Sequence, residues 1–336
     1  MTPAKENQPT IYDVAKLSGL SISTISRVLN APQKVSEATR AKVMAAIDQL
    51  QYTPQAEARA RALQNTRRIG IITPFFTSPS VVQRLRGIDA ALADHRYELI
   101  IYTVDSVEKL DIYLSTLPIT GNLDGLVIIS LPYREEAAER LVRSHLETVS
   151  IEYTYPSFSS VLINDVLGGR LAGRYLASQG HQRVGMIGDV NPPEYAIRPV
   201  VDRLQGLREG LEEFNIILEN RYVCSASFLQ EPTRRSARQL LSMPDRPTAI
   251  FAAADIQAIM TIRVAREMGL RVPEDVAVIG FDDLDIADDI GLTTIRQPLD
   301  DSGRLAAELL LSRLDEPERP VQHVQLPLSL IVRETA

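Results

Sequence analysis

The side chains best suited to a binding chemistry lie close together in the short segment SISTISRVLN. As a helix, it is expected to expose one arginine, three hydroxyl groups and one apolar side chain: Arg27, Ser23, Thr24, Ser26 and Ile22. An arginine can pair with guanine through two hydrogen bonds, an apolar group can contact the methyl of thymine, and hydroxyls can hold phosphates. This set therefore indicates a helix that reads base edges in the major groove of DNA.

Helical periodicity in residues 10–50 predicts the elements that would position this segment. One helix is expected over Ile11–Ser18 and a second from Ile22 to about Leu29, with a turn through Gly19 between them. Two helices joined in this way form a helix-turn-helix. A third helix is expected to begin at Ser36. The same pattern also fits a three-helix bundle that packs on the rest of the chain and binds no DNA, because helix-glycine-helix patterns are common.

Enzymatic chemistry has little support in the sequence. The four histidines belong to no recognisable nucleophile signature, and no glycine-rich phosphate-binding motif follows the first strand. Asp282 and Asp283 are adjacent in a predicted strand, so their side chains point to opposite faces and cannot work as one acid/base pair. We therefore expect no catalytic residues, no cofactor and no metal.

The distribution of charge separates the chain into two parts. Its 336 residues include 36 lysines and arginines and 43 aspartates and glutamates, and the net charge of -7 by itself argues against nucleic acid as a partner. Residues 1–68, however, carry ten basic and five acidic side chains, net +5, so residues 69–336 carry 26 basic and 38 acidic ones, net -12. The N-terminal part can bind phosphates, whereas the acidic remainder repels DNA.

Other features of the composition favour a cytoplasmic protein. The single cysteine, Cys224, excludes an internal disulfide framework and a cysteine-based zinc finger. No apolar run approaches the roughly 18 residues of a membrane span. Residues 1–9 lack the apolar core of a secretion signal and are expected to form a short disordered lead-in.

From residue 68 onward, short apolar runs alternate with helical patterns. Such alternation predicts βαβ units and hence parallel sheets with helices on both faces. A first series runs from IGIIT to VSIEY, and a second begins at VLIND and continues to DVAVIGFDD. The C-terminal remainder has TTIRQP, a helix from about residue 300 to 314, and two short β-rich runs. It is too small for a domain and is expected to complete both sheets.

Ligands of parallel sheets bind beyond the carboxyl ends of the strands, which here means the cleft between two subdomains. Carboxylates at these ends can accept hydrogen bonds from sugar hydroxyls, and aromatic rings can stack on a sugar. The alternatives are structural, because Asp282 could cap nearby backbone and the two aromatic candidates could pack in the core. The candidates that follow strands are Phe75, Ser78, Asp165, Phe228, Asp255 and Asp282.

The stretches TIYDVAKLSGLSISTISRVLN and VSEATRAKVMAAIDQLQYTP closely resemble the DNA-binding head of the LacI/GalR (lactose-repressor) family of bacterial transcription regulators. RLQGLREGL, GLRVPEDVAVIGFDD and LTTIRQP continue the resemblance in the family's order and spacing, so it covers nearly the whole chain. It implies an α/β fold with an N-terminal helix-turn-helix head and a periplasmic-binding-protein-like body of two doubly wound parallel-sheet subdomains.

The resemblance also implies roles for single residues of the head. Ile22, Ser23 and Arg27 would read bases, and the first two would set which operator is bound. The phosphates of the DNA would be contacted by Tyr12, Thr24, Ser26, Asn30, Ser36 and Thr39.

After Pro54, the segment QAEARARALQNTRR would be a hinge helix that folds on DNA and inserts an apolar side chain into the minor groove. The family's usual form has leucine at this wedge position, but an ungapped alignment places Arg61 there and Leu63 two residues later. Three alternatives stay open: a shifted hinge helix that uses Leu63, an Arg61 contact to a narrow minor groove, and a solvated linker whose arginines meet phosphates through charge alone.

In the body, the resemblance implies that Arg203 of RLQG and Asp282 of GFDD hold the effector and that Gln297 of TTIRQP lies near it. A structural role is the alternative for the first two. The chain departs from the family twice, with Ala254-Asp255 where Asn-Asp is frequent and Asn164-Asp165 where Asp-Asn is usual. These departures point to a different sugar, or to a ligand other than a sugar.

These observations predict a ligand-responsive transcriptional regulator, which by family default is a repressor. It is expected to bind a pseudo-palindromic operator as a homodimer. A small-molecule effector, expected to be a sugar, would bind in the cleft. The alternative is a cytoplasmic small-molecule sensor that acts through a protein partner. The expected domains are the lead-in, a helix-turn-helix domain (10–53), a hinge helix or linker (54–67) and an effector-binding and dimerisation domain (68–336). Its N-terminal subdomain would comprise about 68–160 and 298–318, and its C-terminal subdomain about 161–297 and 319–336.

Overall fold

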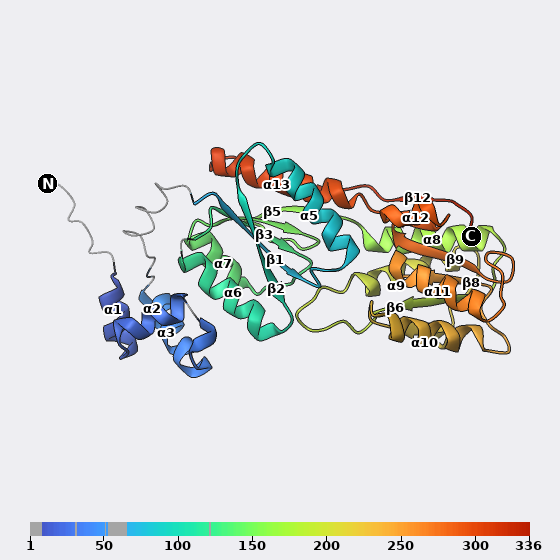
Figure 1. The fold of residues 1–336 in the computed structure, drawn as a ribbon, viewed down its shortest axis with the longest axis horizontal. Helices are drawn as coiled ribbons and strands as arrows, with labels where there is room; N and C mark the ends of the chain where they lie inside the picture. The colour runs from blue at the N-terminus through green and yellow to red at the C-terminus, as the bar shows by residue number, and fades with distance from the viewer. Residues whose placement is uncertain (1–8, 31, 51, 53–65, 121) are drawn as a thin grey trace. The chain divides into compact units, whose positions relative to one another are not determined.

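The structure, a computed structural model, describes residues 9–30, 32–50, 52, 66–120 and 122–336 (Figure 1). The chain divides into two compact units. The first unit contains the residues up to 76, residues 89–160 and residues 306–322, and the second contains residues 77–88, 161–305 and 323–336. The chain therefore passes between the units several times.

The N-terminal part of the first unit is a three-helix head with α1 (Ile11–Ser18), α2 (Ile22–Asn30), the short 3-10 helix η1 (Pro32–Lys34) and α3 (Glu37–Leu50). The predicted helices and the glycine turn are confirmed. Gly19 ends α1 with φ +65°, a left-handed conformation that glycine adopts without steric cost. Ser21 caps α2, because its Oγ accepts a hydrogen bond from the Thr24 amide at 3.2 Å.

One apolar core holds the three helices of the head together. Val14 of α1, Ile25 and Val28 of α2, and Val43 and Ile47 of α3 are buried and pack in the same cluster. Burial of each such side chain stabilises the fold by about 1.5–3 kcal/mol. Because α2 buries its residues 25 and 28, the opposite side of this helix is left at the surface of the head.

The sheet of the first unit has the order β11-β5-β4-β3-β1-β2, and β2, β1, β3 and β4 are parallel. The central strands β1 and β3 are almost entirely buried, in keeping with their apolar runs. The strands of this sheet and the helices between them are β1 (Arg68–Pro74), α5 (Pro79–Leu92), β2 (Glu98–Val104), α6 (Val107–Thr120), β3 (Gly125–Ile129), α7 (Glu135–Arg143), β4 (Glu147–Ile151), β5 (Ser159–Leu162) and β11 (His323–Gln325). Of these, residues 79–88 of α5, residues 161–162 of β5 and all of β11 belong to the second unit.

The sheet of the second unit has the order β12-β10-β9-β8-β6-β7 and is parallel except at β12, which runs antiparallel to β10. Its core includes the fully buried Phe251, Ile279 and Phe281. The elements are α8 (Asp165–Ser178), β6 (Val184–Gly188), α9 (Pro199–Glu212), η2 (Asn220–Tyr222), β7 (Val223–Ser225), α10 (Gln230–Leu241), β8 (Ala249–Ala252), α11 (Asp255–Glu267), β9 (Ala277–Asp282), α12 (Asp285–Asp289), β10 (Thr293–Arg296), α13 (Leu299–Asp315) and β12 (Ser329–Ile331). Residues 306–315 of α13 belong to the first unit.

The prediction that the C-terminal remainder completes both sheets is confirmed, because β11 joins the first sheet and β10 and β12 join the second. The prediction that VLIND opens the second series was wrong. Its strand, β5, lies in the first sheet, where the Ser160 amide donates to the Gln322 carbonyl at 2.8 Å. An apolar run predicts that a strand is buried, but it does not predict which sheet the strand joins. Here the first sheet contains one more strand of the series than expected.

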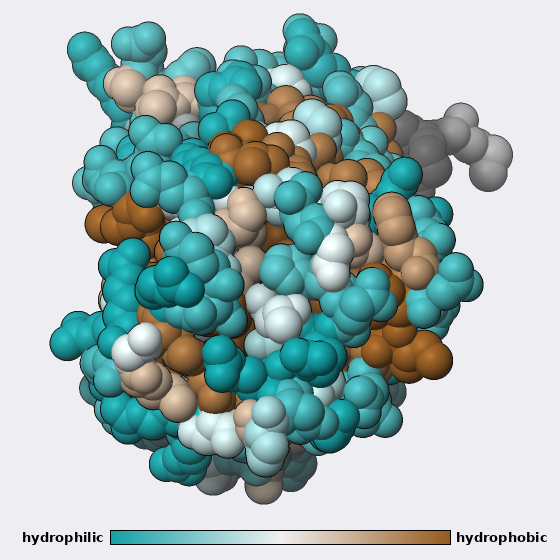
Figure 2. Space-filling model, turned by 90° about the vertical axis from the view of Figure 1, so that its right-hand side faces the viewer, coloured by the Kyte–Doolittle hydropathy of each residue, from teal (hydrophilic) through white to brown (hydrophobic). Residues whose placement is uncertain are grey.

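Figure 2 shows the surface of the second unit that lies on the right-hand side in Figure 1. It is largely hydrophilic, and its apolar side chains form separate patches. Among the described residues, no helix has the length and apolar character that crossing a membrane would require.

Candidate DNA-binding and effector sites

Helix α2 presents the predicted base-reading residues on the surface of the head. Ile22 is 40% exposed although it is apolar, and Ser23 and Arg27 are exposed beside it. Tyr12 of α1 is 69% exposed. Because Ile25 and Val28 are buried on the other side of α2, the helix leaves a short exposed surface with one apolar, one hydroxyl and one guanidinium group. Such a surface suits the major groove.

Three of the predicted phosphate contacts of the head, Thr24, Ser36 and Thr39, lie at the N-termini of α2 and α3. The Ser21 hydroxyl lies 2.8 Å from the hydroxyls of both Ser23 and Thr24 at the start of α2, and those of Ser36 and Thr39 lie 2.8 Å apart at the start of α3. Helix N-termini favour anions because their amides are unpaired and the helix dipole is positive there. Ser26 is half-buried in α2.

Three predicted DNA contacts cannot be placed in this geometry. The side chain of Asn30, together with Arg61 and Leu63 of the predicted hinge, lies outside the described residues. The three alternatives for the hinge therefore stay open.

In the second unit, parallel strands bring several of the predicted effector residues to one edge of the sheet. Asp282 ends β9, and Gln297 directly follows β10, its parallel neighbour. The Gln297 amide nitrogen Nε2 donates a hydrogen bond to Asp282 Oδ1, and both side chains are largely buried. Asp282 adopts a φ of +123°, a strained conformation for a residue with a side chain. Strained backbone is frequent where a side chain must be aimed at a ligand.

Arg203 and Asp165 form a buried ion pair in the same unit. Arg203 Nε lies 2.8 Å from Asp165 Oδ1, and Nη1 donates to the Ala253 carbonyl, which follows β8, at 2.6 Å. The guanidinium carbon lies 3.5 Å from the centre of the Phe281 ring, a cation–π contact. These contacts hold the arginine against the strand ends, and an effector contact by Arg203 stays a prediction.

Asp255 is placed differently from the other carboxylates. It has no exposed surface, and its oxygens accept hydrogen bonds from the Leu284 amide at 2.8 Å and from the Thr294 hydroxyl at 2.5 Å. Burial, together with the charge of Asp282, raises the pKa of Asp255 to about 8. These contacts point to a part in joining β9 and β10 to α11.

The raised pKa of Asp255 gives a prediction for stability. The unfolded chain releases this proton near the ordinary aspartate pKa of 3.8, so between about pH 4 and pH 8 the folded state holds more of this proton than the unfolded state. The free energy of unfolding is therefore expected to fall as pH rises through this interval. Asp255→Asn has no proton to lose and should show a decline smaller by at least about 1.4 kcal/mol, the equivalent of one pKa unit. Urea denaturation at a series of pH values measures this, and equal declines would contradict the raised pKa.

The remaining predicted effector residues lie in separate segments. Phe75 follows β1, is 42% exposed and has a φ of +48°. The Ser78 hydroxyl, just before α5, lies 3.2 Å from that of Ser80. Phe228 is half-buried between β7 and α10. Effector contacts by these three residues stay predictions.

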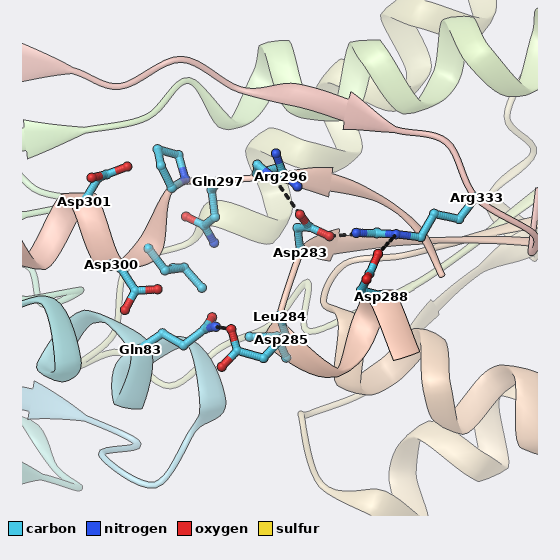
Figure 3. A pocket seen from close by; sticks show the side chains of 12 residues that line it. Gln83, Asp283, Leu284, Asp285, Asp288, Arg296, Gln297, Asp300, Asp301 and Arg333 are labelled. Atoms are coloured by element: carbon cyan, nitrogen blue, oxygen red, sulfur yellow. Dashed lines mark hydrogen bonds and ion pairs between the residues drawn. The ribbon is translucent and has the colours of Figure 1, made fainter. Parts of the chain in front are cut away.

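Asp283, the neighbour of Asp282, faces a different set of groups. It lies between Arg296 and Arg333, whose nitrogens are 2.5 and 2.8 Å from its oxygens (Figure 3). This arrangement is consistent with the prediction that the adjacent carboxylates do not act together. The pocket beside them, of about 550 Å³, is lined mainly by charged side chains.

Sequence reasoning missed one residue of this network. Arg84 of α5 is only 3% exposed, and its Nη2 donates to Gln297 Oε1 at 3.1 Å. Arg84 lies on the helix face that also buries Val81 and Ile88. A charged residue within an apolar stripe was therefore the available signal, because such a residue is costly to bury without partners.

Comparisons with known proteins give one consistent result. Residues 10–55 match the model of bacterial regulatory proteins of the lacI family, and residues 173–336 match that of a periplasmic binding protein-like domain. The chain is 34% identical over 333 residues to the ribose operon repressor of Escherichia coli (strain K12), covering 97% of this chain and 99% of that protein. It is 32% identical to the HTH-type transcriptional repressor PurR of Vibrio vulnificus (strain CMCP6), covering 97% and 98%.

A solved structure agrees with these relatives. The crystal structure of a LacI family transcriptional regulator from Enterococcus faecium with bound ribose superposes with a TM-score of 0.71 and 29% sequence identity, covering 80% of this chain and 98% of that one.

Proposed function

The chain belongs to the LacI family of bacterial regulatory proteins, and we propose that it is a ligand-responsive repressor that binds a pseudo-palindromic operator as a homodimer. The observation that carries the proposal is the head, in which a buried core orients α2 so that Ile22, Ser23 and Arg27 are exposed together. The proposed domain limits are those expected from the sequence, with the head at 10–53, the hinge at 54–67 and the body at 68–336.

Two heads must present their recognition helices about 34 to 36 Å apart, one turn of DNA. An effector that changes how the two bodies meet alters this spacing. By linkage, the effector changes the affinity for DNA by no more than the ratio of its own affinities for the two conformations of the protein. Operator DNA changes the affinity for the effector by the same factor. The protein thus needs no catalytic group, and we place it in the cytoplasm with its DNA.

The proposed effector is a small molecule with hydroxyl groups, most simply a sugar. The supporting feature is the edge of the second sheet, where Asp282 and Gln297 offer buried hydrogen-bonding groups and Arg203 is held by Asp165. Relatives named for the ribose operon and a family structure with bound ribose support the same class. A thermal-shift screen of sugars, sugar phosphates and nucleobases tests it, because a ligand that prefers the folded state raises the melting temperature.

DNA binding through the basic head predicts a strong dependence on salt. If the dimer makes six to ten phosphate contacts, its affinity for operator DNA should fall by about 10³ to 10⁵ between 50 and 200 mM salt. Fluorescence anisotropy with a labelled fragment from upstream of the protein's own gene measures the slope. Affinity that does not change with salt, or no binding at 50 mM, would instead favour the alternative function, a sensor that acts through a protein partner.

A further inference from the structure

A buried arginine of helix α5 contacts the proposed effector site. Residues 79–88 of this helix belong to the second unit. From there Arg84 Nη2 donates to Gln297 Oε1 at 3.1 Å, and Gln297 Nε2 donates to Asp282 Oδ1. The three side chains are 3%, 5% and 5% exposed, so they form a buried chain of hydrogen bonds that ends on the carboxylate.

The chemistry of Arg84 determines which way the Gln297 amide points. A guanidinium group has only donors, whereas an amide has one acceptor oxygen and one donor nitrogen. The oxygen of Gln297 must therefore face Arg84, and the nitrogen is left to face Asp282. If the amide turned over, its oxygen would meet the carboxylate of Asp282, and two acceptors would be opposed. Arg84 excludes that orientation.

The backbone that carries Arg84 is itself held in place. Gly303 of α13 lies so close that a Cβ there would be 2.0 Å from the Arg84 carbonyl oxygen, and a Cβ at Gly87 would be 2.0 Å from that of Asp300. Arg86 adds two hydrogen bonds to Asp300, at 2.6 and 2.7 Å. Close packing at the two glycines holds this part of α5 against α13, so Arg84 can act as a rigid donor, whereas the exposed Arg86–Asp300 pair adds only to stability.

We propose that Arg84 is a positioning residue for effector binding: it orients Gln297 so that one oxygen of Asp282 is held by the amide and the carboxylate is aimed at hydroxyl groups of a neutral ligand. This inference rests on the proposed function, because it takes Asp282 as an effector contact. The charge of Arg84 also offsets that of Asp282, which suits an uncharged, hydroxyl-bearing ligand better than a phosphorylated one.

Calorimetric titration of the full-length protein with ribose tests the inference. Arg84→Met, which keeps the length of the side chain but removes its donors, is expected to bind ribose at least tenfold more weakly. Its operator affinity without ribose should stay within twofold of the unchanged protein. Arg84→Lys restores one donor to Gln297 and should recover part of the loss.

Arg86→Met is the matched control, because it removes an arginine two residues away that contacts Asp285 and Asp300 but has no described contact with Gln297. It should lower the melting temperature and leave ribose affinity within twofold. A merely structural role for Arg84 would make the two variants alike.

A double-mutant cycle separates positioning from general damage. We call the chain of hydrogen bonds from Arg84 through Gln297 to Asp282 the relay. Gln297→Met already breaks the relay, so adding Arg84→Met should cause no further loss of ribose affinity. Equal losses with and without Gln297 would overturn the inference, as would unchanged ribose binding by Arg84→Met. If Arg84→Met does not fold, Gln297→Met alone decides, and ribose binding as tight as in the unchanged protein overturns the relay. No ribose binding by the unchanged protein would overturn the proposed ligand class, and the inference with it.

Discussion

Asp282→Asn is expected to abolish the response to effector while operator binding survives. The substitution keeps the shape of the side chain, and asparagine tolerates unusual φ values better than most residues, so the strained backbone at +123° should persist. It removes a charged acceptor. If two effector hydroxyls donate to this carboxylate, each bond worth about 1.5–3 kcal/mol, the loss is about 3 kcal/mol or more, at least about a hundredfold in affinity.

The measurement is a pair of titrations, of ribose against the protein and of the protein against operator DNA with and without ribose. Asp301→Asn is the matched control, since it makes the same chemical change at an exposed residue that pairs with Arg304. The control should bind and respond normally. If Asp282→Asn fails to fold, or if it responds to ribose with unchanged affinity, the carboxylate is structural and the proposed effector contact is wrong.

The same variant gives an independent readout through Asp255. The charge of Asp282 is one of the two largest causes that raise the pKa of Asp255. Removing that charge should lower this pKa, and the decline of stability with rising pH should become shallower than in the unchanged protein. A pH dependence identical to that of the unchanged protein would show that the two carboxyl groups do not interact.

Arg27→Ala is expected to weaken operator binding by about 30-fold to 10⁴-fold. A bidentate arginine–guanine pair is worth about 1–3 kcal/mol, and a homodimer loses two of them. Lys42→Ala is the matched control, because Lys42 is an exposed basic residue of the head on α3 rather than α2. Its loss should be small and equal for all DNA sequences. Promoter binding at full strength by Arg27→Ala would favour the sensor that acts through a protein partner.

Base reading and phosphate contact can be distinguished within the same head. Replacement of Ile22 and Ser23 together should change which sequence is selected from a randomised operator library. Thr24→Ala or Tyr12→Phe should instead weaken all sites alike, because phosphate contacts carry no sequence information directly. Equal, unselective losses from both sets would contradict the assignment of Ile22 and Ser23 to the bases.

How far the sequence predicted the structure depended on the range of the interactions. The head was predicted in detail because its signals are local. Gly19 ends α1 and Ser21 caps α2 through contacts within a few residues. The alternation of strands and helices in the body is local too, and it gave the fold class. It did not assign β5 to its sheet, because pairing joins segments far apart in the chain, such as Ser160 with Gln322.

The candidate effector site shows the same limit at the level of single residues. Asp255 and Asp282 both follow apolar strands, and nothing in their neighbours separates them. Their hydrogen-bond partners distinguish the two residues, because Asp255 accepts hydrogen bonds from Leu284 and Thr294, which are 29 and 39 residues away. Arg84 was missed because its partner, Gln297, is 213 residues distant.

The sequence by itself therefore determined a helix-turn-helix head with Ile22, Ser23 and Arg27 in its second helix, followed by an α/β body. It also determined that the N-terminal part has a positive net charge and the body a negative one. Only the tertiary structure decided which carboxyl group is fully buried with a raised pKa, which one is held by an amide, and which arginine contacts that amide. The reason is that burial and hydrogen bonding set these properties, and both depend on residues that the chain brings together only when it has folded.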